Sequence, residues 1–393
     1  MLSLARDRSR MQRPKCATLF VWDFTQQSAG ALVLPAGLTF ARASSGHTVQ
    51  NGADALITSG ITSNDVGRIG RLSSAHSYGL YVEPSRTNLI TNSRNLTAAG
   101  WAAGSGATTT ANHAAGPDGA SNATRTQITS GGFSKYFATG GPNARCFSAW
   151  GKALSGLWVP ALEITVQANS LWSSSAATTW ARADFYSTTT AYAVPCDARS
   201  VYTGTTAAAR DVLTDFHQLE AAKYPSSAIV TSGGTATRAG ERPSIDSTRA
   251  AASVVNGRLG VYLKLRALAA SSELAATEGT LLAWAAGSVV VDPTSTYLKA
   301  IDGALYSQTA NAAISWSRYD LLEFAIEVGA GTTQLRWRVN GASVNTASFT
   351  TRDDTLAALN LSAGLDVCNA AASGQMPSIV ERLSTFVPGR GPF

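Results

Sequence analysis

The chain has 393 residues, of which 45% are hydrophobic and 14% are charged, and its formal net charge is +6. This length suits two or three domains of ordinary size. Most of the charge excess lies in the first fifteen residues, which hold five Arg and Lys residues and one Asp, so the rest of the chain is close to neutral. Because nucleic-acid readers gather cations on one surface, this composition argues against a dedicated DNA- or RNA-binding protein.

Other classes of protein are also excluded by the sequence. We find no run that is long and apolar enough to span a membrane, and the apolar stretch 17–22 is too short for the core of a signal peptide. The four cysteines are scattered, without a C-x-x-C pair or a histidine at metal-ligand spacing. We therefore expect free, mostly buried thiols, a reducing compartment during synthesis, and no metal or other cofactor.

Residues 1–87 are predicted to form an extended N-terminal arm. Its first fifteen residues carry the basic cluster and show no strand pattern, which is typical of a disordered or docking tail. A contact between this tail and an anionic partner stays open.

Residues 88–240 predict a first all-β domain. Its expected strands, separated by Gly, Ser, Thr and Pro, are 147–153, 162–168, 180–186 and 212–221. The Ala-rich stretch 99–113 lacks the spacing of an amphipathic helix, so we expect loops and short strands there. The glycines and proline of 231–243 indicate an exposed connection and place a domain boundary near residue 240.

Residues 241–393 show the clearest β pattern. In the segment 258–267, Leu259, Val261, Leu263 and Leu265 fall on one face, and this period of two indicates a half-buried strand. Asn340-Gly341 is a strong hairpin signal. The further strands expected here are 279–285, 295–300, 321–328, 334–339, 358–365 and 379–386. About nine strands in this segment favour a β-sandwich, and no heptad run suggests a coiled-coil shaft.

Four groups of residues carry a resemblance to a known family. They are Trp22-Asp23-Phe24 with Leu38-Thr39-Phe40-Ala41-Arg42-Ala43-Ser44-Ser45; Gly79-Leu80-Tyr81-Val82-Glu83-Pro84-Ser85-Arg86-Thr87-Asn88-Leu89; Ala115-Gly116-Pro117-Asp118-Gly119; and Gln218-Leu219-Glu220 with Tyr224-Pro225-Ser226-Ser227 and Thr237-Arg238. In this order they resemble motifs of bacteriophage tail-fibre, head-spike and minor tail proteins. One departure is Gly67-Arg68-Ile69-Gly70-Arg71, where the family has a Pro-Arg-Phe-Asp segment.

The resemblance implies both a fold and a function. The fold would be all-β, with two tandem antiparallel sandwiches of the jelly-roll type behind the arm: a carbohydrate-binding-module-like one at 88–240 and a concanavalin-like, or laminin-G-like, one at 241–393. The chain would be a structural protein of the virion, as tail fibre, spike or capsid decoration, assembled in the host cytoplasm and adhering to host-surface glycan. Its N-terminal region would dock on other virion proteins, and a homotrimer is expected.

Three other functions stay open. A glycan-cleaving tail-spike enzyme needs two carboxylates about 5–10 Å apart, yet the adjacent pair, Asp353-Asp354, lies in a turn context that favours backbone capping. His47, His76, His113 and His217 lack the context of a catalytic triad or a zinc site. A purely structural decoration protein and a secreted bacterial lectin are the remaining alternatives. We therefore expect no catalytic residues and no enzyme activity.

Two sets of residues are singled out as sites. Arg42, Glu83, Arg86 and Asn88 form the expected structural cluster, in which ionic side chains pin the arm to the first sandwich. Trp101, Trp150, Trp284 and Trp337 are expected in the cores. The glycan-binding candidates are Trp158, Trp172, Trp180, Tyr186 and Trp316, because they flank Ser- and Gly-rich loops or a turn and because sugar rings stack on exposed aromatic rings.

Overall fold

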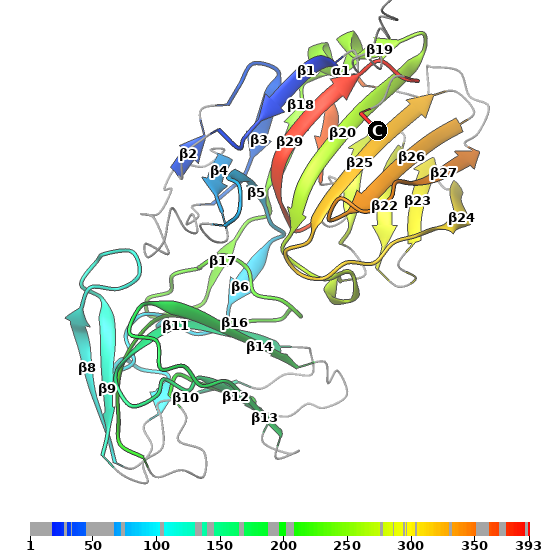
Figure 1. The fold of residues 1–393 in the computed structure, drawn as a ribbon. Helices are drawn as coiled ribbons and strands as arrows, with labels where there is room; N and C mark the ends of the chain where they lie inside the picture. Colours follow the sequence, from blue (N-terminus) through cyan, green and yellow to red (C-terminus); the bar gives the residue numbers. More distant parts are fainter. Residues whose placement is uncertain are drawn as a thin grey trace, which may run out of the picture.

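The computed structural model describes residues 18–26, 30–32, 34–44, 67–71, 75–102, 106–129, 136–139, 145–164, 169–187, 196–201, 208–275, 278–285, 287–293, 295, 297–302, 305–329, 332–350, 361–368, 375–389 and 392–393. Nearly all of the regular structure is β, and the prediction of an all-β fold with tandem antiparallel sandwiches is confirmed. We call the sandwich built mainly from the middle of the chain sandwich 1, and the other sandwich 2 (Figure 1).

Sandwich 1 consists, in its described residues, of two five-stranded sheets. One sheet has the order β14 (Ala181–Ser187), β11 (Arg145–Ser155), β16 (Arg210–Glu220), β9 (Ala123–Ile128) and β8 (Ala107–Ala114). The other has the order β13 (Asn169–Trp172), β12 (Ala161–Ile164), β15 (Cys196–Arg199), β10 (Tyr136–Thr139) and β7 (Trp101–Ala102). The chain crosses repeatedly between the sheets, as in a jelly roll. Phe147, Leu162, Ala198 and Val212 fill the space between them.

Sandwich 2 has a larger and a smaller sheet. Among the described residues the larger has ten strands: β2 (Gly30–Leu32), β4 (Gly67–Gly70), β5 (Gly79–Val82), β29 (Ser378–Phe386), β20 (Arg258–Ala267), β25 (Leu321–Gly329), β26 (Thr332–Val339) and β27 (Asn345–Thr350), with β1 (Thr18–Asp23) beside β29 and β19 (Val254–Val255) beside β20. The smaller has the order β24 (Leu305–Ala313), β23 (Tyr297–Asp302), β22 (Gly287–Asp292), β21 (Thr280–Trp284), β28 (Leu365–Val367), β18 (Arg242–Ile245) and β3 (Leu38–Ala41).

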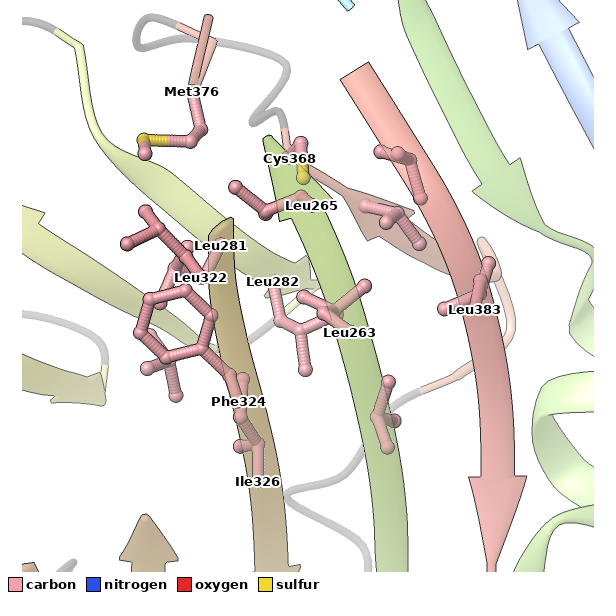
Figure 2. Packing of buried hydrophobic residues seen from close by; sticks show 14 of the residues in the cluster. Leu263, Leu265, Leu281, Leu282, Leu322, Phe324, Ile326, Cys368, Met376 and Leu383 are labelled. Carbon is pink, nitrogen blue, oxygen red and sulfur yellow. The ribbon is translucent and has the colours of Figure 1, made fainter. Parts of the chain in front are cut away.

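The core of sandwich 2 follows from the alternation seen in the sequence. Leu263 and Leu265 of β20 are fully buried and point to the same side as Phe324 of β25. Figure 2 shows these side chains packed beside Leu281 and Leu282 of β21, which belongs to the opposite sheet. Burial of each such side chain is worth about 1.5–3 kcal/mol. A short helix, α1 (Ser247–Ala252), follows β18 because Asp246 caps its N-terminus by accepting a hydrogen bond from the Arg249 amide.

The N-terminal strands overturn one expectation about the domains. We predicted an extended arm at 1–87, but the described part of 18–82 supplies β1–β5 to both sheets of sandwich 2. In β3, Leu38 and Phe40 are buried while Thr39 and Ala41 are exposed, so even a four-residue strand adds an apolar face to the core. Strands this short are difficult to recognise in a sequence. Residues 1–17, with the basic cluster, lie outside the described residues.

Sandwich 1 is therefore inserted between two parts of sandwich 2. The chain leaves sandwich 2 after β5 and passes through β6 (Arg86–Asn88), and it returns through β17 (Ala236–Arg238) to β18. These two connecting strands pair with each other, with Thr87 opposite Thr237. Insertion is tolerated where the two crossing points lie close together. We call this paired connection the neck.

Several other elements differ from the expectations. The stretch 99–113, where we expected loops and short strands, contains most of β8, which is longer than expected at eight residues. The strands β22 and β24 were also missed. The predicted strand 162–168 begins as expected with β12, which ends at Ile164, and 165–168 lie outside the described residues. Of the predicted strand 358–365, residues 358–360 lie outside the described residues, 361–364 form a turn instead, and only Leu365 belongs to a strand, β28.

Candidate functional site

A buried ionic cluster lies beside the neck. It comprises Arg42 after β3, Arg68 in β4, Glu83 after β5, Arg238 in β17 and Glu241 just before β18, and each of these residues is at most 2% exposed. We call these five residues the neck cluster. Three cations and two carboxylates with so little access to water are stable only if each makes several charged hydrogen bonds.

The carboxylates of the neck cluster accept bonds from both sides of the neck. Arg68 Nη2 donates to Glu83 Oε2 at 2.6 Å and to Glu241 Oε2 at 2.7 Å, and Arg42 Nη1 lies 3.0 Å from Glu241 Oε1. Glu83 also accepts from the Ser227 amide at 2.7 Å and from the Ser227 hydroxyl at 2.6 Å. Ser227 follows the last strand of sandwich 1, so Glu83 ties that sandwich to β5 of sandwich 2.

Electrostatics keep Arg68 and Glu83 charged. Burial by itself would raise the pKa of Glu83, but the charges of Arg238 and Arg68, with hydrogen bonds from Arg68 and Ser227, lower it to about 2. Burial opposes the charge of Arg68, and the neighbouring Glu241 and Glu83 outweigh burial and raise its pKa. Both partners therefore stay ionised at neutral pH. The lowered pKa makes Glu83 unsuited to acid-base catalysis, which needs a pKa near the working pH.

Arg86 and Asn88 hold the neck at two further points. Arg86 Nη2 donates to Glu278 of sandwich 2 at 2.6 Å and to the Tyr224 hydroxyl at 2.7 Å. The Asn88 side chain donates to the carbonyls of His217 at 3.0 Å and Ile229 at 2.8 Å. Its oxygen accepts from two backbone amides, so Asn88 uses its full hydrogen-bonding capacity inside sandwich 1.

The sequence prediction named Arg42, Glu83, Arg86 and Asn88, and the structure brings Arg42 and Glu83 into one cluster. It places Arg86 and Asn88 at separate contacts along the neck. Arg68 and Glu241 were missed. Arg68 stands in the segment that departs from the family motif, and Glu241 lies in a stretch predicted as an exposed connection. A buried charge in a Gly-rich segment gives no local signal, because its partners come from other parts of the chain.

Two of the predicted glycan-binding tryptophans are buried, which corrects that prediction. Trp158 is 1% exposed, donates to the Ser200 carbonyl at 3.1 Å, and packs against Gly151 in the core of sandwich 1. Trp316 is 6% exposed and donates to the Ala269 carbonyl at 2.8 Å. Neither ring offers a free face for a sugar. Both lie in loop-like sequences, but each side chain packs into the core of its sandwich.

Trp180 is partly exposed, whereas only the backbone of Trp172 is described. Trp180 is half-buried against Trp150 and Phe216, and the ammonium of Lys152 lies 5.2 Å from its ring centroid. It therefore keeps part of its ring at the surface. The backbone of Trp172 ends β13, and its side chain lies outside the described residues. Of the expected core tryptophans, Trp101, Trp150 and Trp337 are buried and Trp284 is half-buried.

A surface cluster forms where the two sandwiches meet. Asp184 and Tyr186 lie on one face of β14 in sandwich 1, and Arg318 and Tyr319 lie in the turn before β25 in sandwich 2. Arg318 Nη1 donates to Asp184 Oδ2 at 2.5 Å, and its guanidinium carbon lies 5.6 Å from the Tyr186 ring centroid. We call these four residues the junction cluster. It unites Tyr186 with the turn that follows Trp316, which were separate candidates in the sequence.

The junction cluster combines exposed rings with fixed polar groups. Tyr186 is 37% exposed and Tyr319 is 41% exposed. Arg318 is held in place because it also donates to Glu273 at 2.6 Å and to the Lys223 carbonyl at 3.0 Å. Partial burial and the nearby Asp184 raise the pKa of Tyr319, so the charge of Asp184 acts on that hydroxyl.

Tyr319 also adopts a strained backbone conformation. Its φ is +71°, in the left-handed region that bulky residues rarely occupy, at a cost of roughly 1–3 kcal/mol. Two hydrogen bonds hold it there: the Tyr319 amide donates to the Ala267 carbonyl at 2.7 Å, and Arg266 donates to the Tyr319 carbonyl at 2.8 Å. Strain of this kind gathers at functional sites, where it presents a side chain.

The other ionisable groups considered in the sequence lie elsewhere. His217 is fully buried, donating through Nδ1 to the Ser93 carbonyl at 2.9 Å and accepting from Ser200 at 2.7 Å. His113 is exposed on β8, and His76 is partly exposed. Asp353, Asp354 and His47 lie outside the described residues. Within the part of the chain that the structure describes, no group of three or more His, Cys, Asp or Glu residues is arranged to hold a metal ion, and no helix is long and apolar enough to cross a membrane.

Comparison with known proteins gives little guidance. The chain matches no family model and no curated protein. One solved structure with some similarity is the N-terminal CBM22-1-CBM22-2 tandem domain of Xyn10C from Paenibacillus barcinonensis, which is 11% identical. The alignment covers 78% of this chain and 98% of that chain, with a TM-score of 0.27. A score this low supports no inference about function.

Proposed function

We propose that this chain is a structural protein of a bacteriophage particle, as tail fibre, spike or capsid decoration, and that it adheres to host-surface polysaccharide without cleaving it. The main support for the proposal is where the structure places the residues that resemble the phage motifs. Arg42, Glu83, Asn88 and Arg238 make the buried contacts beside and along the neck. Among them Glu83, which accepts from Ser227 of sandwich 1, holds the two sandwiches together, which is what a rigid particle component requires.

The junction cluster supports the adhesive part of the proposal. Tyrosine rings offer apolar faces that stack on sugar rings, while guanidinium and carboxylate groups bond the sugar hydroxyls. Tyr186 and Tyr319 present such faces, and Arg318 and Asp184 supply fixed polar groups between them. We propose this cluster as the glycan-contacting surface, with Trp180 as a second contact on sandwich 1. Multiple copies in one particle would add avidity to modest affinity.

The adhesion test uses purified protein and the capsular or lipopolysaccharide polymer of the host bacterium. We expect Tyr186→Ala and Tyr319→Ala each to weaken binding roughly tenfold, or about 1.4 kcal/mol, with an unchanged melting temperature. Tyr297→Ala, at a half-buried tyrosine in β23, is the matched control and should bind like the wild type. Absence of binding by the wild type overturns adhesion and leaves a structural role. Shortening of the polymer by the wild type identifies an enzyme instead.

The particle test addresses location. Antibodies against the chain should label intact particles, and the labelled part distinguishes head, baseplate and fibre tip. We propose that the basic N-terminal residues dock on other virion proteins, so deletion of residues 1–15 should reduce incorporation into particles while the β-rich circular dichroism signal persists. Particles that contain no copy of the chain would overturn the virion proposal, whatever the outcome with polysaccharide.

A further inference from the structure

The strand β8 forms an open edge of sandwich 1. It pairs with β9 on one side, with Thr109 opposite Thr126, and no described strand pairs with its other side. Figure 1 shows β8 at the outer margin of the molecule, away from sandwich 2. The backbone donors and acceptors along that margin are available to another strand.

Most other strand edges in the described residues are short, carry charged residues or lie close to another strand. Among the described strands, β1 also pairs on one side only, with β29, and its six residues end with the charged Asp23. The edge strands β2, β3, β7 and β13 have three, four, two and four residues. At the opposite edge of the same sheet, β14 carries two charged residues: Arg182 donates to the Ser226 carbonyl, and Asp184 accepts from Arg318 of sandwich 2. The edge strands β24 and β27 of sandwich 2 lie close to each other. In contrast, β8 has eight residues and an edge along which no described strand pairs.

The composition of β8 lacks the usual protection of an edge. Proteins blunt open edges with lysine, other charges or proline, and Ala107–Ala114 contains none of these. Thr108 and Thr110 are exposed, and threonine favours the extended backbone. The one irregularity comes at the C-terminal end, where the register with β9 shifts between Thr110 and Ala114 and Asn112 has a φ of +52°. The regular edge is therefore 107–111.

The sequence of this edge reads the same in both chain directions, so the edge can pair antiparallel with an identical strand. Residues 107–111 read Ala-Thr-Thr-Thr-Ala, a palindrome centred on Thr109. An antiparallel partner with the same sequence would place Ala107 opposite Ala111 and Thr108 opposite Thr110, and threonine pairs of this kind stabilise sheets. A two-fold axis through Thr109 generates this arrangement, and such an isologous contact closes on two copies.

We propose that β8 pairs antiparallel with β8 of a second copy of this chain, so that two five-stranded sheets join into one continuous sheet across a two-fold axis. The occupant of the edge is another copy because a palindromic, uncharged strand offers no feature that selects a different partner. This contact does not depend on glycan binding or on a place in a virion. It yields a dimer, whereas the family resemblance implies a trimer.

The test introduces charges at Thr108 and Thr110, which face each other in the proposed strand pair. Thr108→Lys with Thr110→Lys sets lysines of the two copies opposite each other, and we expect the dimer to dissociate to monomers in sedimentation equilibrium. Thr108→Lys with Thr110→Glu sets each lysine opposite a glutamate of the second copy, and we expect the dimer to return. Circular dichroism and melting of each variant establish that it is folded.

A matched control carries the same charges elsewhere. Thr346→Lys with Ser348→Lys adds two lysines at exposed alternate positions of β27, and it should leave the dimer intact. A wild type that stays monomeric at high concentration overturns the proposal. So does a dimer or trimer that survives the paired lysines at β8, or a lysine-glutamate variant that is folded and remains monomeric.

Discussion

Arg68 and Glu83 form an ion pair with 2.6 Å between Nη2 and Oε2, in a place where both side chains are almost fully buried. The two residues come from neighbouring strands of sandwich 2, but Glu83 simultaneously accepts two hydrogen bonds from Ser227, which follows the last strand of sandwich 1. This pair therefore helps to fix the position of one sandwich relative to the other.

Arg68→Met should destabilise the protein strongly. The substitution leaves Glu83 and Glu241 buried with fewer cationic partners, and breaking a buried pair in this way costs about 3–5 kcal/mol. Urea unfolding measures the loss. Arg125→Met removes the partly exposed pair between Arg125 and Asp211, and it should change the urea midpoint little because exposed ion pairs contribute little. Equal effects of the two substitutions would contradict a special role for the neck cluster.

Glu83 should govern part of the acid unfolding. Its pKa is lowered from 4.5 to about 2, so the folded state holds this carboxylate charged where the unfolded state already protonates it. The resulting stabilisation, roughly 3 kcal/mol, is complete above pH 4.5 and is lost as the pH falls toward 2. Glu83→Gln should be less stable than the wild type at pH 7, and the difference should shrink below pH 4.5. A constant difference from pH 7 to pH 3 would rule this out.

As the pH falls, buried His217 should begin to destabilise the fold at a higher pH than Glu83 does. Burial lowers its pKa from 6.5 to about 4, so below pH 6.5 the unfolded state takes up a proton that the folded state refuses. Stability is therefore unaffected above pH 6.5 and falls by roughly 3 kcal/mol between pH 6.5 and 4. His217→Gln should flatten the urea stability profile across this window. His113→Gln, at an exposed histidine, should keep the wild-type profile.

Gly151 and Trp158 should show strong coupling in sandwich 1. A Cβ at Gly151 would lie 2.2 Å from Trp158 Cε2, so Gly151→Ala forces the indole to move and should cost about 1–3 kcal/mol. Trp158→Ala should cost about 3–5 kcal/mol, because the ring is buried. In the double variant the added methyl enters the vacated space, and its cost should disappear. Additive losses in melting and urea experiments would show that the two residues do not share a site.

Strand patterns with many residues could be predicted from the sequence alone. The alternation of Leu259, Val261, Leu263 and Leu265 predicted β20 because each neighbour on a strand points to the opposite face, which is a local property of the backbone. The same holds for β25 and β29. In contrast, β3 and β4 have four residues each, too few to show a period, and their membership in sandwich 2 depends on partners far along the chain.

Only the tertiary structure decided which candidate residues meet and which are buried. The sequence placed Trp158 and Trp180 together on loops, but the inward position of Trp158 follows from the space left by Gly151 of β11. Tyr186 and Trp316 were separate candidates in the sequence, and Tyr186 meets Arg318, two residues after Trp316, because β14 lies against the turn before β25. Long-range pairing is fixed by the packing of whole sheets, and short motifs carry no information about it.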